Sequence, residues 1–158
     1  MAKGTIQKLV SKNESAKELY DKSYGYAVFS NIKAAFLITS ARGKGVAVHK
    51  ESDGRVYMKM GSLGAGIGYG LQKMQVVFLF QTKRAFDNFL NSGWRAETAA
   101  DVAVAKKGAT FDIEFKNGIA VFQLTEKGLM AQANLSGSKY SIVKKLNRSV
   151  ENPYVRNK

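Results

Sequence analysis

The sequence predicts an α+β domain, in which N-terminal helices pack on a strongly curved antiparallel β-sheet or barrel-like sandwich, with one short helix near residues 83–91. Two observations carry this prediction. Apolar residues recur at helical spacing over the first 22 residues, and from Tyr24 onward short β-rich runs alternate with glycine-containing turns. A single proline, Pro153, and 15 glycines also fit strands joined by tight turns.

The N-terminal segment is predicted to be helical over residues 5–22, with a break between Lys12 and Ser15. Ser15 followed by Glu18 fits a capping box, which would restart the helix after the break. An apolar stripe on this segment is expected to cover a core, and shallow insertion into a membrane interface is the alternative. The stripe consists of Ile6, Leu9 and Val10.

Five β-rich runs follow and are predicted to be strands. They are YGYAVFS, AAFLITS, GVAVHK, RVYMKM and QVVFLFQ. The pair Asp53-Gly54 predicts a tight hairpin turn before RVYMKM. The run KRAFDNFL, residues 83–90, places its apolar residues on one helical face and is predicted to form a short helix that ends at Gly93.

The last third of the chain is predicted to be a four-stranded antiparallel meander. Its strands would be FDIEF, IAVFQL, LMAQANL and KYSIV. FDIEF alternates apolar and acidic residues, as a half-buried strand does. Asn117-Gly118 is a strong hairpin signal between the first two of these strands.

The segment GSLGAGIGYG, residues 61–70, places glycine at every second position of a predicted strand. Because side chains alternate between the two faces of a strand, these glycines would leave one face bare. They are Gly64, Gly66, Gly68 and Gly70. The pattern predicts close packing or sheet curvature at this face, and a ligand-facing groove is the alternative. A nucleotide-binding loop does not fit, because neither GxxxxGK[ST] nor GxGxxG is present.

The composition predicts a single basic domain with an anionic partner. The formal net charge of +13 favours a membrane surface, nucleic acid or an acidic protein, with a purely solubilising charge as the alternative. No apolar run reaches the roughly 18–20 residues of a spanning helix, so no transmembrane segment is expected. The start MAKGTIQKLV lacks the apolar core of a signal peptide, which leaves open a cytoplasmic location or a signal already removed.

No catalytic constellation stands out, so the chain is predicted not to be an enzyme. The absence of cysteine excludes disulfides and thiol catalysis, and a serine triad would have to use His49, which is expected at the surface. Glu51 and Asp53 are expected in a solvated turn, and Asp112 and Glu114 on an outward strand face. No cofactor and no metal site is predicted.

Five ordered blocks of the sequence resemble the SYLF domain, a lipid-binding family that includes Ysc84-related actin-binding proteins. The blocks are YGYAVFSNIKAA, RGKGVAV, GSLGAGIGYGLQ, VVFLFQTKRAFDNF and NGIAVFQLTEKGLMAQANLSGSKYS. The resemblance extends from about Ile6 to Ser141. It therefore predicts a single SYLF-like domain over residues 1–146, followed by a basic C-terminal tail over residues 147–158.

This resemblance implies a non-catalytic protein that binds anionic phospholipid membranes, notably phosphoinositides. Some fungal members of the family also bind and bundle actin. Bacterial members are commonly envelope or secreted proteins and often lipoproteins, so a peripheral membrane protein of the bacterial envelope, or a secreted protein, is expected. No cysteine is present to carry a lipoprotein anchor.

The basic residues gather in the N-terminal helices, in a predicted turn and near the C-terminus, and are predicted to form a lipid-binding basic patch. Each is worth on the order of 1 kcal/mol close to an anionic bilayer. A scattered distribution over the surface is the alternative. The residues are Lys8, Lys12, Lys17, Arg42, Lys44, Lys144, Lys145 and Arg148.

Two other functions remain as alternatives, a protein-interaction module of the actin-binding type and a nucleic-acid-binding protein. The second rests on the charge and on strand aromatics that could stack on bases, namely Tyr24, Tyr26, Phe78 and Phe80. These aromatics lie inside apolar runs and are expected to pack in the core. Because no RNP-like signature is present either, no nucleic-acid partner is expected.

Overall fold

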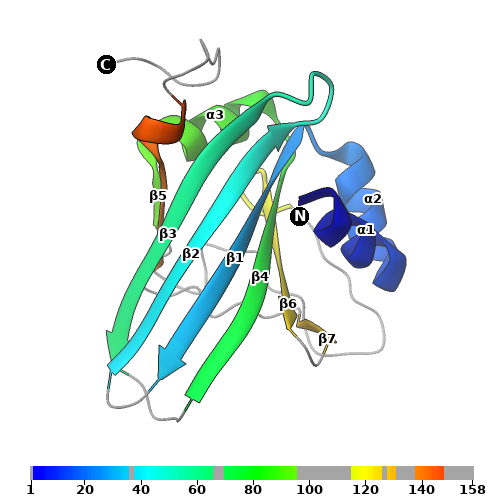
Figure 1. Cartoon of the computed structure of the whole chain (residues 1–158). Coiled ribbons are helices and arrows are strands. Elements are labelled where there is room, and N and C mark those ends of the chain that lie inside the picture. Colours follow the sequence, from blue (N-terminus) through cyan, green and yellow to red (C-terminus); the bar gives the residue numbers. More distant parts are fainter. Residues whose placement is uncertain are drawn as a thin grey trace.

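The computed structural model of the chain describes residues 2–35, 38–65, 70–95, 115–125, 128–130 and 138–147 (Figure 1). Its helices are α1 (Ala2–Lys12), α2 (Glu14–Lys22), α3 (Lys83–Ser92) and the 3-10 helix η2 (Lys144–Asn147). Its strands are β1 (Gly25–Ala35), β2 (Ile38–His49), β3 (Arg55–Ala65), β4 (Gly70–Phe80), β5 (Trp94–Arg95), β6 (Ile119–Thr125), β7 (Gly128–Met130) and β8 (Ser138–Ile142). N-terminal helices pack on an antiparallel sheet, so the predicted α+β class is confirmed.

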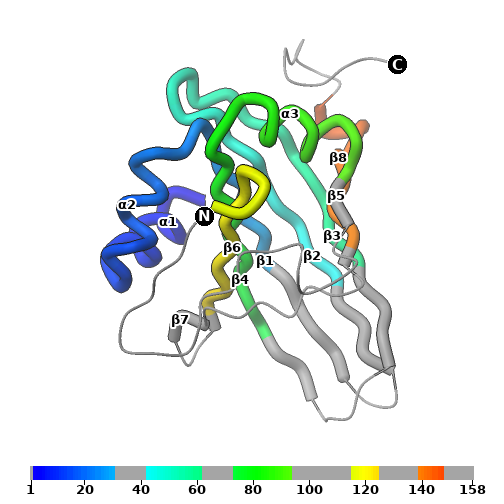
Figure 2. The backbone as a smooth tube through the Cα atoms, turned by 180° about the vertical axis from the view of Figure 1, so that it is seen from behind, coloured from blue at the N-terminus to red at the C-terminus, as the bar shows by residue number. Residues whose placement is uncertain are grey.

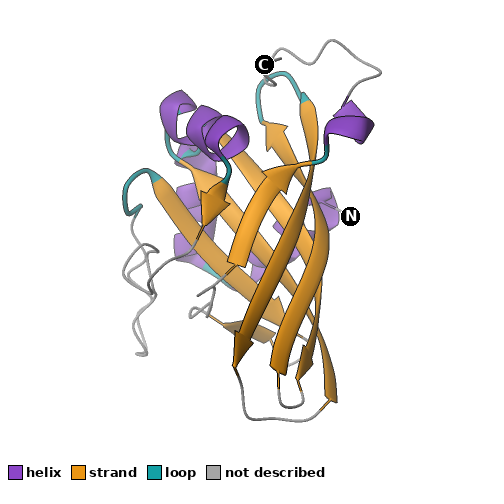
Figure 3. Cartoon of the chain, turned by 90° about the vertical axis from the view of Figure 1, so that its left-hand side faces the viewer, coloured by secondary structure: helices purple, strands orange, loops and turns teal. Residues whose placement is uncertain are grey.

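The described strands form one antiparallel sheet in the order β5-β8-β3-β2-β1-β4-β6-β7. β1, β2 and β3 pair in sequence, and β4 returns to pair with β1, which is a Greek-key arrangement. Figure 3 shows that the sheet is twisted and curved, with helices gathered towards one end of the strands. In Figure 2, α1 and α2 lie on one side of the molecule, and β5 and β8 lie on the other beside β3.

One face of the sheet, the inner face, carries an aromatic cluster covered by α3. Phe78 is fully buried, and its ring centroid lies 5.0 Å from that of Phe89 on α3 and 4.9 Å from that of Tyr140 on β8. Phe29 lies 5.8 Å from Phe78 and 4.7 Å from Tyr140. Aromatic pairs at such separations stabilise a fold by about 0.5–1.5 kcal/mol beyond area burial. The cluster therefore joins β1, β4, β8 and α3.

The opposite face, the outer face, is covered by α1 and α2 over only part of its length. Leu9 of α1 is fully buried in a cluster that contains Val28 of β1 and Val46 of β2. Two residues further along the same strands, Ser30 and Lys44 occupy the same face and are exposed. The helix cover thus ends between these two rows, and Figure 1 shows the strands continuing beyond the helices.

The break between the first two helices is where the sequence predicts it, but the cap differs. The side chain of Asn13 accepts a hydrogen bond from the backbone N of Ala16 at 3.0 Å, and Ser15, the predicted cap, lies inside α2. Asparagine is as good an N-cap as serine, and the earlier residue takes the position here. The expectation that the apolar stripe covers a core is confirmed, because Ile6 and Leu9 are buried.

The predicted turns and the end of α3 are confirmed by the backbone geometry. Asp53 has a φ of 56°, and Asn117 and Gly118 have φ values of 53° and 78°. Gly93 ends α3 with a φ of 68°. Glycine, asparagine and aspartate tolerate this left-handed region better than other residues do, which is why the sequence signals are dependable here.

The first strands are longer and fewer than predicted. AAFLITS was expected to be a strand of its own, but it contains the end of β1 and the start of β2. Arg42 and Lys44 were expected in a turn, and both lie within β2. They occupy exposed outer-face positions, where polar residues fit a strand well. The turn predicted at these two residues was therefore wrong.

The predicted C-terminal meander is confirmed where IAVFQL pairs with the start of LMAQANL, but it is wrong for KYSIV. β6 pairs with β4 and β7 at one side of the sheet, whereas β8 pairs with β3 and β5 at the other side. Turn residues and alternation report a local strand but not its partner. Tyr140 shows why β8 belongs beside β3, since its buried ring completes the inner aromatic cluster. Of the predicted FDIEF strand, only Phe115 lies within the described residues.

The glycine segment connects two strands that are not neighbours. Gly64 lies in β3 and Gly70 begins β4, while Gly66 and Gly68 fall outside the described residues. β2 and β1 lie between β3 and β4 in the sheet. The close packing predicted for the four glycines stays a prediction.

Candidate functional site

Four basic residues from three strands meet on the outer face, and we call them the basic cluster. They are Arg42 and Lys44 of β2, Lys59 of β3 and Lys139 of β8. The register pairs Lys44 with Lys59, and it pairs Gly61 with Arg42 on one side and with Lys139 on the other. Paired residues of antiparallel strands share a face, so the four side chains emerge on one surface. All four are exposed.

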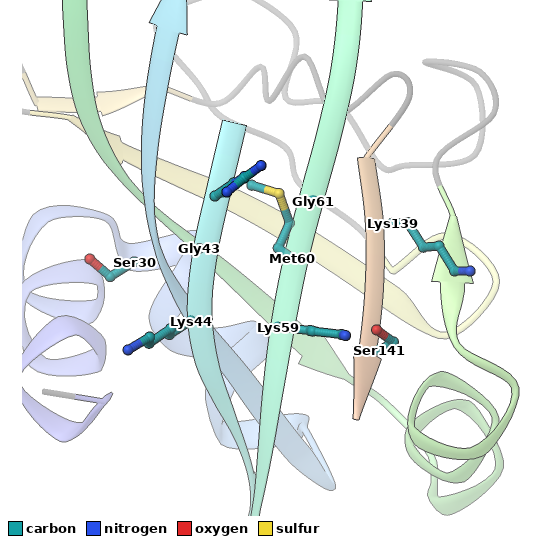
Figure 4. Close-up of a pocket in the computed structure, with 9 residues that line it drawn as sticks. Ser30, Gly43, Lys44, Lys59, Met60, Gly61, Lys139 and Ser141 are labelled. Carbon is teal, nitrogen blue, oxygen red and sulfur yellow. The ribbon is translucent and has the colours of Figure 1, made fainter. Parts of the chain in front are cut away.

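The spacing of the basic cluster follows from strand geometry. Paired residues have Cβ atoms about 4.5–5.5 Å apart, and residues two apart along a strand are separated by about 7 Å. Lys44 and Lys59 are therefore direct neighbours, and Arg42 and Lys139 lie one row further along. Figure 4 shows Lys44, Lys59 and Lys139 around a groove of about 900 Å³. The lining of this groove also includes Arg42, Ser30, Ser141, Gly43 and Met60.

Gly61 lies between Arg42 and Lys139 and opens the groove to the strand backbone. A Cβ built at Gly61 would meet nothing within 4 Å. A glycine in a strand costs backbone entropy and packs nothing, and it often marks a place where a ligand approaches closely. In this row of the outer face, two cationic side chains therefore flank a position that carries no side chain.

The basic cluster has no acidic counterpart among the residues that the structure describes. The ion pairs that form among the described residues are Lys3–Asp53, Lys17–Asp21, Arg55–Asp53 and Lys83–Asp87, and none of them includes a residue of the basic cluster. Like charges directly opposite each other on a sheet are destabilising. Lys44 and Lys59 form such an opposed pair. The arrangement thus weakens the fold slightly, and it favours a multivalent anion at the surface.

The other predicted basic residues lie elsewhere. Lys8, Lys12 and Lys17 are exposed on α1 and α2, and none of them lines the groove. Lys144 and Lys145 are exposed on η2. Arg148 lies outside the described residues. The structure therefore brings two of the eight predicted residues, Arg42 and Lys44, into one cluster.

Sequence reasoning missed Lys59 and Lys139. Lys59 alternates with the apolar Met58 and Met60 in RVYMKM, so an outward position could have been inferred. Its proximity to Lys44 depends on the register between β2 and β3. The position of Lys139 depends on the pairing of β8 with β3, for which the sequence contains no local signal.

The residues considered for catalysis have structural surroundings. His49 was expected at the surface, but only 8% of it is exposed. Its Nδ1 lies 2.7 Å from Ser52 Oγ, and its ring packs 4.5 Å from Tyr24, so it stabilises the hairpin. Glu51 and Asp53 are exposed at this hairpin, as predicted. Asp112 and Glu114 lie outside the described residues.

Within the described ranges, no group of three or more histidine or acidic residues could hold a metal ion. In the same ranges, no helix combines the length and the apolar character required to cross a bilayer.

The C-terminal turn η2 is fixed to β3 by one asparagine. Asn147 Oδ1 accepts from the backbone N of Tyr57 at 2.9 Å, and its Nδ2 donates to the carbonyls of Tyr57 and Val143 at 2.8 Å each. The predicted domain boundary at residue 146 stays a prediction. Asn147 itself, assigned to the tail, is attached to the sheet.

Replacing Asn147 with alanine is expected to loosen η2 from β3. The backbone amide of Tyr57 then loses its acceptor, and its hydrogen exchange should become about tenfold faster, as expected for a loss of about 1.4 kcal/mol. Exchange measured by NMR tests this, with Asn88→Ala at an exposed position of α3 as the control. An unchanged rate at Tyr57 would show that the amide does not depend on Asn147.

Comparison with known proteins identifies the family. The Ysc84 family, described as Las17-binding protein actin regulator, matches residues 61–155. Beta cell expansion factor A of Aeromonas veronii is 40% identical over 146 residues, which cover 92% of this chain and 56% of that protein. SH3 domain-containing YSC84-like protein 1 of Homo sapiens is 30% identical over 125 residues, which cover 74% of this chain and 36% of that protein.

The chain thus spans about half of the bacterial relative and about a third of the human one. The region matched by the family model contains the end of β3 and all of β4, α3 and β8. Of the basic cluster, it includes Lys139. The family match covers more than half of the chain, and the bacterial relative aligns with nearly all of it. The chain belongs to the SYLF, or Ysc84, family.

Proposed function

We propose that this protein is a non-catalytic lipid-binding protein that docks on anionic phospholipid membranes through the outer face of its sheet. The observation that carries the proposal is the basic cluster, four exposed cations on one surface without an acidic partner in the described part of the chain. At about 1 kcal/mol per cation near an anionic bilayer, four cations supply about 4 kcal/mol, which is roughly a thousandfold in affinity.

The groove suits a headgroup with several phosphates, as in a phosphoinositide. Arg42 can bind a phosphate with two parallel hydrogen bonds, and Lys44 and Lys59 add compact charges beside it. The hydroxyls of Ser30 and Ser141 supply further donors at the rim. Lysines on α1, α2 and η2 would add longer-range attraction within a Debye length.

This function places the protein at a membrane surface as a peripheral protein. We extend the proposal to the bacterial envelope or a secreted form, in line with the expectation from the SYLF resemblance. Fractionation of native cells, with the protein detected in the envelope, secreted or cytoplasmic fraction, tests this location.

Vesicle co-flotation tests the docking. We expect binding to phosphatidylcholine vesicles that contain phosphatidylserine or a phosphoinositide, none to phosphatidylcholine alone, and a steep loss between low and moderate salt. An oligonucleotide should not displace the vesicles. Equal binding to neutral vesicles would contradict electrostatic docking, and displacement by the oligonucleotide at low concentration would favour a nucleic-acid partner.

A protein-interaction function is the second candidate. The family description, Las17-binding protein actin regulator, favours a protein partner of the actin-binding type. Co-sedimentation with actin filaments in the absence of lipid tests it. Saturable co-sedimentation that persists at moderate salt would support this function over membrane docking.

A further inference from the structure

A second cavity, of about 460 Å³, lies under α1 and is distinct from the groove of the basic cluster. It lies between α1, the end of α2, the outer face of β1 and β2, and the hairpin that follows β2, and it is partly open to solvent. None of its lining residues lines the groove. Its contents can therefore differ from whatever binds at the sheet surface.

The cavity has an apolar wall. Ile6 and Val10 of α1 and Val48 of β2 line it. Ile6 and Val48 are buried, at 5% and 2% exposure, and Val10 is partly buried. Burying apolar ligand surface against such side chains is favourable by about 25 cal/mol per Å².

The other side of the cavity is polar and holds unused hydrogen-bond donors. Tyr26 is only 4% exposed, and its hydroxyl makes no hydrogen bond within the described residues. The ring centroids of Tyr20 and Tyr26 lie 5.8 Å apart. Lys50 Nζ donates to the carbonyls of Tyr20 at 2.6 Å and Asp21 at 3.5 Å, which leaves one of its three protons available. The Tyr26 hydroxyl is not among the fully buried atoms without a partner, so it remains accessible and can donate to an acceptor bound in the cavity.

The ionisation states suit an anionic acceptor. Burial raises the pKa of the Tyr20 and Tyr26 phenols, with smaller contributions from nearby Asp21 for Tyr20 and from Tyr20 and Asp53 for Tyr26, so both remain donors at neutral pH. Burial lowers the pKa of Lys50, and nearby Asp21 opposes this shift. A negative charge beside the ammonium would favour its charged form.

The charged residues that line the cavity favour a ligand with one negative charge. Lys3 and Asp53 form an ion pair of 3.9 Å, and both side chains are exposed. Lys50 remains as the excess cation among the lining residues. One carboxylate would balance it. A phosphate monoester, which carries nearly two negative charges at neutral pH, would exceed it.

We propose that this cavity binds an amphiphilic monocarboxylate of medium chain length. Its carboxylate accepts hydrogen bonds from Tyr20, Tyr26 and Lys50, and its chain packs on Ile6, Val10 and Val48. A volume of about 460 Å³ holds about fifteen non-hydrogen atoms with their hydrogens, at about 30 Å³ each. A fatty acid of about ten carbons fits that space.

Titration calorimetry of the full chain with sodium decanoate, below the concentration at which it forms micelles, tests the proposal. We expect saturable binding of one decanoate per chain. Tyr26→Phe, which removes only the hydroxyl, and Lys50→Met should each weaken it about tenfold. Tyr57→Phe, on the exposed outer face away from the cavity, should leave it unchanged. Circular dichroism verifies that each variant is folded.

Two analogues of the same chain length identify the headgroup. Decanol binding as tightly as decanoate, or decyl phosphate binding more tightly, would overturn the carboxylate assignment. No saturable decanoate binding would show that the cavity holds only water. Vesicle co-flotation of Tyr26→Phe should match the wild type, so this proposal and the docking proposal can fail separately.

Discussion

Replacing Gly45 with alanine is expected to destabilise the protein by about 3 kcal/mol. A Cβ at this position of β2 would lie 2.3 Å from Cδ1 of Phe29 and 2.6 Å from the backbone oxygen of Val28. Phe29 cannot move away easily, because its ring packs against Phe78 and Tyr140 inside the inner aromatic cluster. The backbone oxygen belongs to the neighbouring strand, so relief would also strain the pairing of β1 with β2.

Gly61→Ala is the matched control, because Gly61 is an exposed strand glycine with open space around its Cβ position. Its stability should be unchanged or higher by up to about 1 kcal/mol, since alanine restricts the unfolded chain. Urea denaturation of both variants measures the difference, and the melting temperature of Gly45→Ala should fall by about 6–12 °C. Equal stability of the two variants would mean that the ring of Phe29 can be displaced at little cost.

Sequence reasoning succeeded where the signal is local. The turns at Asp53 and Asn117-Gly118 and the end of α3 at Gly93 require positive φ angles, which few residue types tolerate. The alternation of RVYMKM likewise predicts a strand with Met58 and Met60 on one face, and the structure buries both. These features depend on a residue and its immediate neighbours alone.

Sequence reasoning failed where the position of a strand depends on a partner distant in the sequence. KYSIV has the composition of a strand, but its pairing with β3 instead of β7 follows from the packing of Tyr140 against Phe29 and Phe78. The same pairing brings Lys139 to the basic cluster. Arg42 and Lys44 could therefore be predicted as site residues from the sequence, although they were expected in a turn. Lys59 and Lys139 could not.

Removing the charges of the basic cluster is expected to reduce membrane affinity by about a thousandfold at low salt. The variant replaces Arg42, Lys44, Lys59 and Lys139 with glutamine. It should fold normally, and it should be slightly more stable than the wild type, because the opposed pair Lys44 and Lys59 no longer repel. Co-flotation with phosphatidylserine- and phosphoinositide-containing vesicles gives the affinity, and urea denaturation gives the stability.

A control with the same change in net charge separates a local site from a general attraction. Lys22, Lys83, Arg84 and Lys116 are exposed, none lines the groove, and they again comprise one arginine and three lysines. Their replacement with glutamine removes one surface ion pair, Lys83–Asp87, which typically contributes less than about 1 kcal/mol to stability. We expect this control to lose at most about tenfold in affinity, through reduced long-range attraction.

A third variant, with Lys8, Lys12 and Lys17 changed to glutamine, measures the predicted contribution of the helices. It should fall between the other two, because these residues are exposed on the helices that pack on the outer face but do not line the groove. Equal losses in the basic-cluster variant and the matched control would refute a docking site on the sheet, since net charge alone would then explain binding. The largest loss in the helix variant would transfer the site to α1 and α2.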